Sequence, residues 1–283
     1  MSRITGGHRL TSECIQGGVR SIRPKSWIHL QGLLFANTWN RSLQRFRSDF
    51  AYRGLGNADW ALKTSLSRLG GNYRELEAHL LRNFKKYALQ TPRNSEYSEW
   101  TWLALAQHHG LPTRMLDWTY SPYVALHFAT SRLEDYKRDG VIILVNYVQV
   151  HRILPVRLKQ VLTRERSNAF TAEMLDRVTK SLAGLERLSS RDFALYLEPP
   201  SLDDRIVNQF ALFSMMSNPD TQFDDWIASR LPPGVARRIV VPAVMKWEIR
   251  DKLDQANITE RVLFPGLDGL SRWLRRHYTQ RLP

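Results

Sequence analysis

The sequence has almost no cysteine, no long apolar run and a shortage of acidic residues. Cys14 is the only cysteine among 283 residues, which excludes an intrachain disulfide and a zinc site built from several cysteines. No apolar stretch approaches the ~18 residues that a membrane-spanning helix needs, so we expect no membrane partner. Residues 1–24 are basic and polar and lack the apolar segment of a secretory signal. We therefore expect a cytoplasmic protein.

The shortage of acidic residues leaves a strong positive charge. The chain has 41 Lys and Arg against 27 Asp and Glu, a formal net charge of +14. Residues 1–48 carry eight basic side chains against the single acid Glu13, and residues 271–283 carry four arginines and no acid. Clustered cations attract polyanions. The basic ends therefore favour contact with nucleic acid or a ribonucleoprotein, or else they serve solubility alone.

The domain organisation follows from composition and hydrophobic pattern. Hydrophobic residues make up 43% of the chain, as is typical of a folded domain. We expect a basic flexible arm over residues 1–24 and an α+β domain over residues 25–283, with a helical insertion at about residues 157–190. Residues 141–145 form an unbroken apolar run, which indicates a strand covered on both faces. Other expected strands lie at residues 50–54, 193–197, 209–216 and 238–241.

The first stretch that carries chemistry is the triplet Tyr52-Arg53-Gly54. An arginine at a strand end next to glycine places a fixed guanidinium beside backbone that a ligand can approach closely. The planar guanidinium also donates two parallel hydrogen bonds to a phosphate group. The alternative is a structural arginine that pairs with an acid such as Asp59.

The second stretch, residues 106–122, combines amide, imidazole, guanidinium, carboxylate, indole and hydroxyl groups in what we predict to be a helix–turn–helix junction. Such groups are costly to bury unless they satisfy one another, so their density indicates a pocket wall. The alternative is a closed network in which Arg114 pairs with Asp117. The neighbouring His108 and His109 point about 100° apart on a helix, and we expect no metal site there.

Together these stretches resemble the FRG domain, which takes its name from an aromatic-Arg-Gly triplet. The matching pieces are residues 52–68, 106–119, 197–200, 205–213 and 263–270. The resemblance spans about residues 26–277, and FRG domains occur in bacterial and phage proteins. Their layout is similar to that of ADP-ribosyltransferases of the Arg-Ser-Glu type. The resemblance implies an ADP-ribosyltransferase-like α+β fold, in which short strands form a mixed sheet among helices, and NAD as the co-substrate.

The resemblance also implies roles for individual residues. The residues expected to bind NAD are Tyr52, Gly54, Arg114, Trp118, Thr119 and Ser121. Arg53 would hold the pyrophosphate or a ribose as part of the catalytic set. Thr119 and Ser121 would shape the nicotinamide-ribose pocket, with Tyr52 or Trp118 stacked on the nicotinamide ring.

The third catalytic position departs from the Arg-Ser-Glu pattern. Where those enzymes have a glutamate on a later strand, this chain has Gln209. Breaking the nicotinamide–ribose bond develops positive charge on the ribose, which a carboxylate stabilises and an amide does not. Three alternatives follow: Glu198 approaches the site, Gln209 suffices, or the fold retains only nucleotide binding.

The resemblance therefore implies an NAD-dependent ADP-ribosyltransferase, an enzyme of the glycosyltransferase class. It would act as a toxin, a phage-defence effector or a phage-borne factor on a nucleic-acid or protein target, with an antitoxin as a further partner. The alternative is a non-catalytic nucleic-acid-binding or adaptor module. A third alternative is a metal-dependent nuclease.

Overall fold

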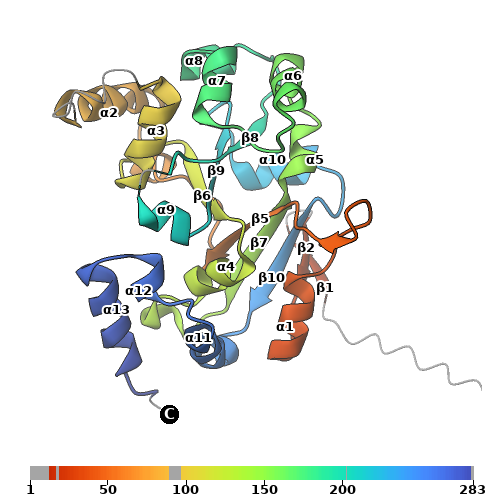
Figure 1. The fold of residues 1–283 in the computed structure, drawn as a ribbon, viewed down its shortest axis with the longest axis vertical. Helices are drawn as coiled ribbons and strands as arrows, with labels where there is room; N and C mark the ends of the chain where they lie inside the picture. Colours follow the sequence, from red (N-terminus) through yellow and green to blue (C-terminus); the bar gives the residue numbers. More distant parts are fainter. Residues whose placement is uncertain (1–12, 17–18, 89–96, 202, 282–283) are drawn as a thin grey trace, which may run out of the picture.

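The computed structural model describes residues 13–16, 19–88, 97–201 and 203–281. Eight strands form one sheet in the order β1-β2-β10-β7-β5-β6-β9-β8 (Figure 1), and β3 and β4 form a separate hairpin. The sheet is mixed, because β2 runs parallel to β10 while the other pairs are antiparallel. The predicted α+β class with a mixed sheet is confirmed. The strands are β1 (Glu13–Gln16), β2 (Val19–Ile22), β3 (Trp39–Asn40), β4 (Arg45–Phe46), β5 (Phe50–Leu55), β6 (Met115–Thr119), β7 (Gly140–Asn146), β8 (Ala194–Leu197), β9 (Ala211–Met216) and β10 (Ala236–Val241).

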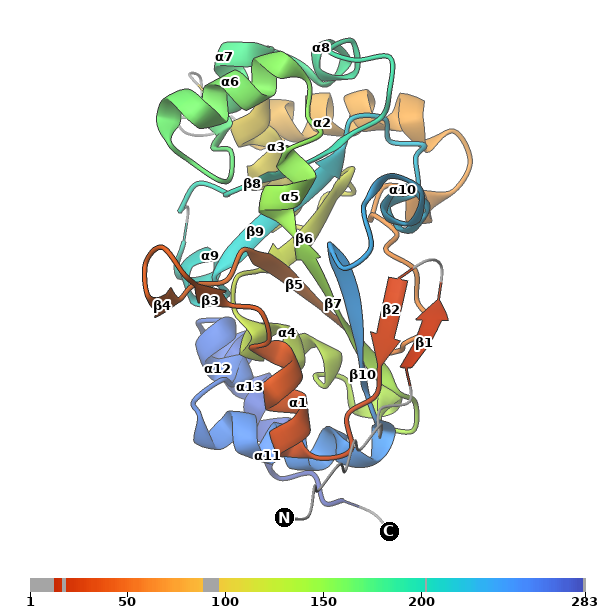
Figure 2. The same ribbon diagram turned by 90° about the vertical axis from the view of Figure 1, so that its right-hand side faces the viewer.

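Helices cover the sheet from two sides, as Figure 2 shows with α6, α7 and α8 above the strands and α11, α12 and α13 below. The helices are α1 (Trp27–Leu34), α2 (Tyr73–Ala88), α3 (Glu99–His108), α4 (Pro122–Ala129), α5 (Tyr147–His151), α6 (Val156–Glu165), α7 (Ala172–Val178), α8 (Leu182–Glu186), α9 (Asp204–Asn208), α10 (Phe223–Arg230), α11 (Lys246–Gln255), α12 (Glu260–Leu263) and α13 (Leu267–His277). Three of them, α6 to α8, occupy the segment predicted as a helical insertion. Within the described residues, no helix combines the length and apolar character that crossing a membrane requires.

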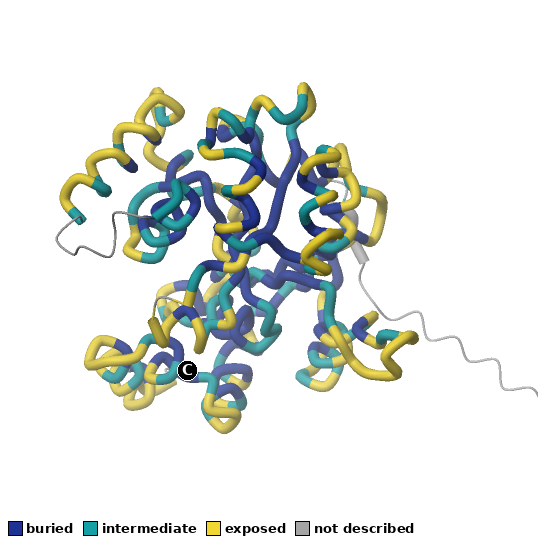
Figure 3. Tube along the Cα trace, turned by 45° about the horizontal axis from the view of Figure 1, so that its top comes forward, coloured by how far each residue is buried: buried dark blue, intermediate teal, exposed yellow. Residues whose placement is uncertain are grey.

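Three apolar cores hold these layers together, and one of them lies between α5, α10 and the central strands. A second joins α3, α6, α7 and α8 to strands β8 and β9, and a third joins α1, α4 and α11 to β5, β7 and β10. All seven residues of β7 are buried, which confirms the strand predicted to be covered on both faces. Figure 3 shows burial concentrated in the strands, with exposed residues along the outer helices.

Serine side chains cap the starts of α3 and α4. The Ser98 side chain accepts a hydrogen bond from the backbone N–H of Thr101 at the start of α3. Ser121 does the same for Val124 at the start of α4, where Pro122 occupies the first turn. These two caps set where α3 and α4 begin, on either side of β6.

Residues 115–119 form strand β6 and not the turn between two helices that the sequence suggested. The prediction was wrong because a short apolar run is ambiguous between helix and strand, and here β9 supplies a full antiparallel partner. Part of the predicted arm is also structured. Residues 13–16 and 19–22 form a hairpin at the sheet edge because β2 pairs with β10. The remaining arm residues 1–12, 17 and 18 lie outside the described residues.

The sheet is split between β5 and β6. β5 pairs with β7 along its whole length, and β6 pairs with β9 along its whole length. Between β5 and β6, however, the described residues form a single pair, Tyr52 with Thr119. Beyond that pair the two strands diverge and leave backbone groups facing a gap.

Candidate functional site

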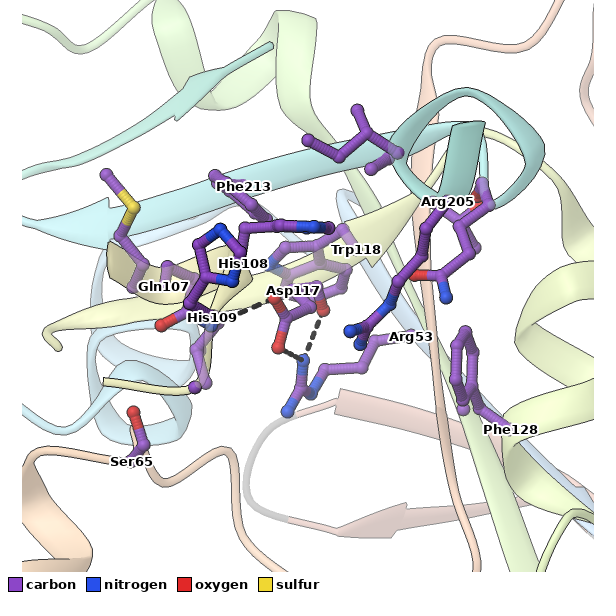
Figure 4. A pocket seen from close by; sticks show the side chains of 18 of the residues that line it. Arg53, Ser65, Gln107, His108, His109, Asp117, Trp118, Phe128, Arg205 and Phe213 are labelled. Carbon is purple, nitrogen blue, oxygen red and sulfur yellow. Dashed lines mark hydrogen bonds and ion pairs between the residues drawn. The ribbon is translucent and has the colours of Figure 1, made fainter. Parts of the chain in front are cut away.

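A cleft of about 910 Å³ opens where β5 and β6 diverge (Figure 4). Its walls come from these two strands, the end of α3, residues 63–68 and α9. Its volume lies in the upper part of the range of about 300–1,000 Å³ that is usual for small-molecule sites. The elements that form it are far apart in the chain, so the cleft exists only in the folded protein.

Arg53 reaches from β5 across the gap to β6. Its Nη1 donates a hydrogen bond to the backbone carbonyl of Asp117 and lies 3.9 Å from the Oδ2 of the same residue. The side chain is only 17% exposed, and its Nε has no hydrogen-bond partner within the described part of the chain. Burial lowers the pKa of Arg53, while the negative charge of Asp117 opposes that change. The guanidinium therefore donates the hydrogen bond that a backbone N–H would donate between paired strands, and it keeps its positive charge.

The Asp117 carboxylate is held by a chain of directional hydrogen bonds. The backbone N–H of Met115 donates to the Thr113 hydroxyl, which in turn donates to Gln107 Oε1 at 2.6 Å. This orients the Gln107 amide so that its Nε2 donates to Asp117 Oδ1 at 2.9 Å. The Asp117 side chain is nevertheless 62% exposed. Asp117 thus presents a positioned acceptor to the cleft.

A second pair of polar side chains joins the end of α3 to the start of α9. His108 ends α3, and its Nε2 lies 2.6 Å from Oδ2 of Asp203. Asp203 caps α9 by accepting a hydrogen bond from the N–H of Ile206. Burial opposes ionisation of Asp203, but the N–H of Ile206 and the His108 ring outweigh it and lower the pKa of this carboxyl. The sequence prediction missed this pair, because only the fold brings residues 95 positions apart together.

Further cations surround these groups. Lys63, Arg68 and Arg205 line the cleft together with Arg53. The Arg205 guanidinium lies 5.1 Å from the centre of the Phe264 ring, which fixes it against an apolar surface. Figure 4 shows Arg205 and Arg53 on neighbouring parts of the cleft. The cleft therefore has a positive wall suited to an anionic ligand.

Four of the residues predicted to bind NAD line the cleft. They are Tyr52, Gly54, Trp118 and Thr119. Thr119 is committed to the fold, because its hydroxyl donates to the backbone carbonyl of Gln209 at 2.7 Å. The Trp118 ring is buried and its Nε1 donates to Ser214. These two side chains therefore shape the wall.

Tyr52 and Gly54 pack in the apolar core behind the cleft wall. The Tyr52 ring is fully buried and its hydroxyl contacts Ser48 and the carbonyl of Leu34, so the predicted stacking of this ring on a ligand is not met in this structure. A Cβ on Gly54 would lie 1.8 Å from the carbonyl oxygen of Ala125. Glycine is required here because α4 packs directly on β5.

The other predicted residues lie outside the cleft lining. Arg114 is buried and binds Glu77 through Nε at 2.9 Å and Glu186 through Nη1 at 3.1 Å. It therefore supports the fold and does not pair with Asp117. Ser121 caps α4, and Glu198 accepts a hydrogen bond from the Tyr120 hydroxyl at 2.8 Å.

Gln209 lines the cleft from a position other than the one predicted. It follows α9 as the C-terminal cap residue, and β9 begins only at Ala211. The helical turn forms because Asp203 caps it. The side-chain amide of Gln209 donates to the carbonyl of Leu263 at 2.9 Å and so ties α9 to α12. Among the described residues, no group of three or more His, Cys, Asp or Glu side chains is arranged to hold a metal ion.

Comparison with known proteins identifies one family. Neither a curated protein nor a solved structure gives a significant match. The model of the FRG domain family matches residues 48–138. This segment includes Arg53, His108 and Asp117, three of the polar groups that face the cleft. The chain therefore contains an FRG domain over residues 48–138, and this domain supplies a large part of the cleft.

Proposed function

We propose that the cleft binds NAD and that the protein is an ADP-ribosyltransferase-like enzyme of the glycosyltransferase class. The observation that carries this proposal is the pairing of Arg53 with a positioned Asp117 carboxylate inside one large cleft. Arg53 on β5, and Thr119 on β6 directly before α4, also agree with the order of strand, strand and helix that the resemblance implies. The proposal assigns the anionic part of NAD to the cations and its reacting ribose to Asp117.

Arg53 would bind the NAD pyrophosphate. Its Nη1 is used by the Asp117 carbonyl, but its Nη2 forms no hydrogen bond with the described residues. Nη2 is therefore free to donate to a phosphate oxygen. Lys63 and Arg68 line the same cleft and add positive charge that the two phosphates would neutralise.

Asp117 would act where the Arg-Ser-Glu pattern places a glutamate. Loss of nicotinamide leaves positive charge on the ribose, and a fixed carboxylate stabilises that charge. The Gln107 amide holds Asp117 in one orientation before the substrate arrives. Glu198 lies outside the cleft lining and Gln209 uses its amide to bind Leu263, so Asp117 is the better candidate.

The direct test is to incubate the protein with NAD labelled in the nicotinamide ring and to measure nicotinamide release and ADP-ribose transfer. We expect release by the wild-type protein and loss of it in R53A and D117N. R132A is the matched control, because Arg132 is exposed, pairs with Glu134 and lies outside the cleft lining. A wild-type protein that neither binds NAD nor releases nicotinamide would contradict the proposal. The same assay with added RNA, DNA or cell protein would identify the acceptor expected of a toxin or phage-defence effector.

A second candidate function, binding of single-stranded nucleic acid, is favoured by the β3–β4 hairpin. Arg41, Arg45 and Arg47 are exposed on it and form no ion pair among the described residues. Trp39 and Phe46 are 46% and 67% exposed, and their rings pack edge to face with centroids 4.9 Å apart. Figure 2 shows this hairpin as a separate loop beside β5. Arginines with exposed rings suit phosphates and unstacked bases.

Charge-matched variants test this second function. We expect R41A/R45A/R47A to weaken binding of a labelled single-stranded oligonucleotide and to reduce its salt dependence. R164A/R187A/R230A removes the same charge from exposed arginines elsewhere and should have a smaller effect. Equal losses in the two triple variants would show that only total charge matters. NAD turnover by R41A/R45A/R47A separates this function from the first.

A further inference from the structure

The pair of His108 and Asp203 lies in the cleft but plays no part in the proposed contacts with NAD. Both oxygens of Asp203 accept hydrogen bonds, Oδ1 from the N–H of Ile206 at 3.1 Å and Oδ2 from the His108 ring at 2.6 Å. An ionised carboxylate has no proton to donate, so Nε2 of His108 carries the hydrogen. The other ring nitrogen, Nδ1, then holds a free lone pair. It forms no hydrogen bond with the part of the chain that the structure describes.

His108 is held firmly enough to act in one orientation. Its side chain is only 8% exposed, and it sits at the end of α3, whose body is packed in the core. Asp203 is fixed in turn because it caps α9. His109 is different: it is exposed and forms no ion pair within the described residues, although its ring lies 5.1 Å from that of His108.

Carboxylates and cations line the cleft that contains this histidine. Asp203 and Asp204 lie on the α9 wall and Asp117 lies on β6. Arg205 comes from α9, Arg53 from β5, and Lys63 and Arg68 from residues 63–68. Because Nε2 is bound to Asp203, Nδ1 is the ring atom that can take up a proton from a ligand in this cleft.

We propose that His108 is the general base of the reaction assigned to this cleft, with Asp203 as its positioning residue; this inference rests on the proposed function. The bond between the ribose C1′ and the nicotinamide nitrogen breaks, and nicotinamide leaves with the electron pair. An oxygen of the acceptor forms the new bond to C1′. Its proton passes to Nδ1 of His108 and then to water. NAD and a hydroxyl thus give an ADP-ribosylated product, nicotinamide and one proton.

A general base also narrows the class of acceptor. A thiolate or a carboxylate attacks without losing a proton, whereas a neutral hydroxyl or a water molecule becomes a good nucleophile only when a base removes its proton. We therefore infer an acceptor that must lose a proton as it attacks, and we assign it to the hydroxyl-bearing class. Water and a sugar or side-chain hydroxyl share this chemistry, and the products separate them. Water gives free ADP-ribose, whereas a macromolecular hydroxyl gives a labelled macromolecule.

The first experiment compares H108Q with H109Q over pH 5–9, with nicotinamide release as the readout. We expect wild-type activity to rise with pH, because a general base must be unprotonated to act. H108Q should lose this rise and reduce kcat by about 10²–10⁴-fold, with KM for NAD nearly unchanged. H109Q should keep the rise. If H108Q keeps the pH-dependent rise, or H109Q loses it as well, the assignment of His108 is wrong.

The second experiment measures the tautomer of His108, which its hydrogen bond to Asp203 sets, and needs no enzyme turnover. In protein with ¹⁵N-labelled histidine, NMR should show His108 as the Nε2–H tautomer in wild type, and D203A should abolish that preference. D203N should lower kcat and alter the pH profile, because an amide can also accept the Nε2 hydrogen but does not stabilise the imidazolium. An Nδ1–H tautomer in the wild type would overturn the proposal even if the enzyme is active. If the wild type releases no nicotinamide, the proposed function fails, and the role of His108 in it fails too.

Discussion

Arg53 on β5 donates a hydrogen bond to the backbone carbonyl of Asp117 on β6 across the gap where the sheet is split. In a continuous sheet a backbone N–H would fill this place. Because the Arg53 side chain acts in place of a backbone N–H, the two strands stay apart, and a cation and a carboxylate lie side by side in the cleft. Arg53 thus has both a structural role and a chemical role, and variants can separate the two.

We predict that R53K separates charge from geometry. Lysine keeps the positive charge but cannot donate to both the Asp117 carbonyl and a phosphate with a planar fork. NAD affinity should fall by about tenfold, which is ~1.4 kcal/mol. The free energy of unfolding should fall by only about 1 kcal/mol, the usual size of one hydrogen bond. Calorimetric titration with NAD and urea unfolding measure the two effects. A large loss of stability with no loss of affinity would make Arg53 purely structural.

For Asp117 we predict an effect on catalysis with little effect on binding. D117N keeps the size of the side chain but removes its negative charge. If the carboxylate stabilises the transition state, kcat should fall by about 10²–10³-fold while KM changes little. Steady-state nicotinamide release measures both constants. D225N, an exposed position outside this cleft, is the control and should behave as wild type.

Arg114 should matter for stability far more than an exposed arginine. Arg114 and Glu77 are both buried, and Arg114 also donates to the carbonyl of Ser217 at 2.7 Å. R114A leaves the Glu77 charge buried without its partner, so the free energy of unfolding should fall by about 3–5 kcal/mol. R132A removes an exposed arginine and should cost at most about 1 kcal/mol. Urea unfolding distinguishes them, and equal losses would contradict the buried network.

Gly54 should not tolerate a side chain. G54A would force a methyl group against the Ala125 carbonyl, so β5 and α4 must separate and stability should fall by about 1–3 kcal/mol or more. G32A is the opposite case, because Gly32 lies in α1 with open space around it. Alanine there should raise the melting temperature by favouring helix. If G54A melts like the wild type, the close packing of α4 on β5 is wrong.

Acid should destabilise the protein through its buried histidines. Burial lowers the pKa of His151 to about 4, and burial together with Arg250 lowers the pKa of His127 to about 3. The unfolded chain therefore binds more protons than the folded one below about pH 6.5, and stability falls as pH drops from there towards the folded values. Each histidine contributes a slope of up to about 1.4 kcal/mol per pH unit. Urea unfolding at pH 7 and pH 5 measures the slope, which H151Q should reduce. An unchanged slope in H151Q would mean that His151 is not buried in its neutral form.

Local patterns in the sequence account for several elements. Residues 141–145 read as a buried strand because every position is apolar. Ser98 and Ser121 each accept a hydrogen bond from a free N–H of a first helical turn, and Pro122 occupies a first-turn position without an N–H that would need a partner. The prediction for β6 was wrong because a segment this short becomes a strand or a helix according to the neighbour with which it pairs. Strand β2 escaped prediction for the same reason, since its partner β10 is more than 200 positions away.

By itself, the sequence determined the chemistry available to the site: the Tyr-Arg-Gly triplet, the polar segment around Asp117, the FRG resemblance and the positive charge. Only the tertiary structure decided which of these groups meet. It placed Arg114 and Tyr52 in the core and left Arg53 and Asp117 facing each other. It also brought Asp203 within hydrogen-bond distance of His108. The physical reason is that capping and hydrophobic period act within a few residues. Contacts across a split sheet depend on strand pairing and packing over the whole chain.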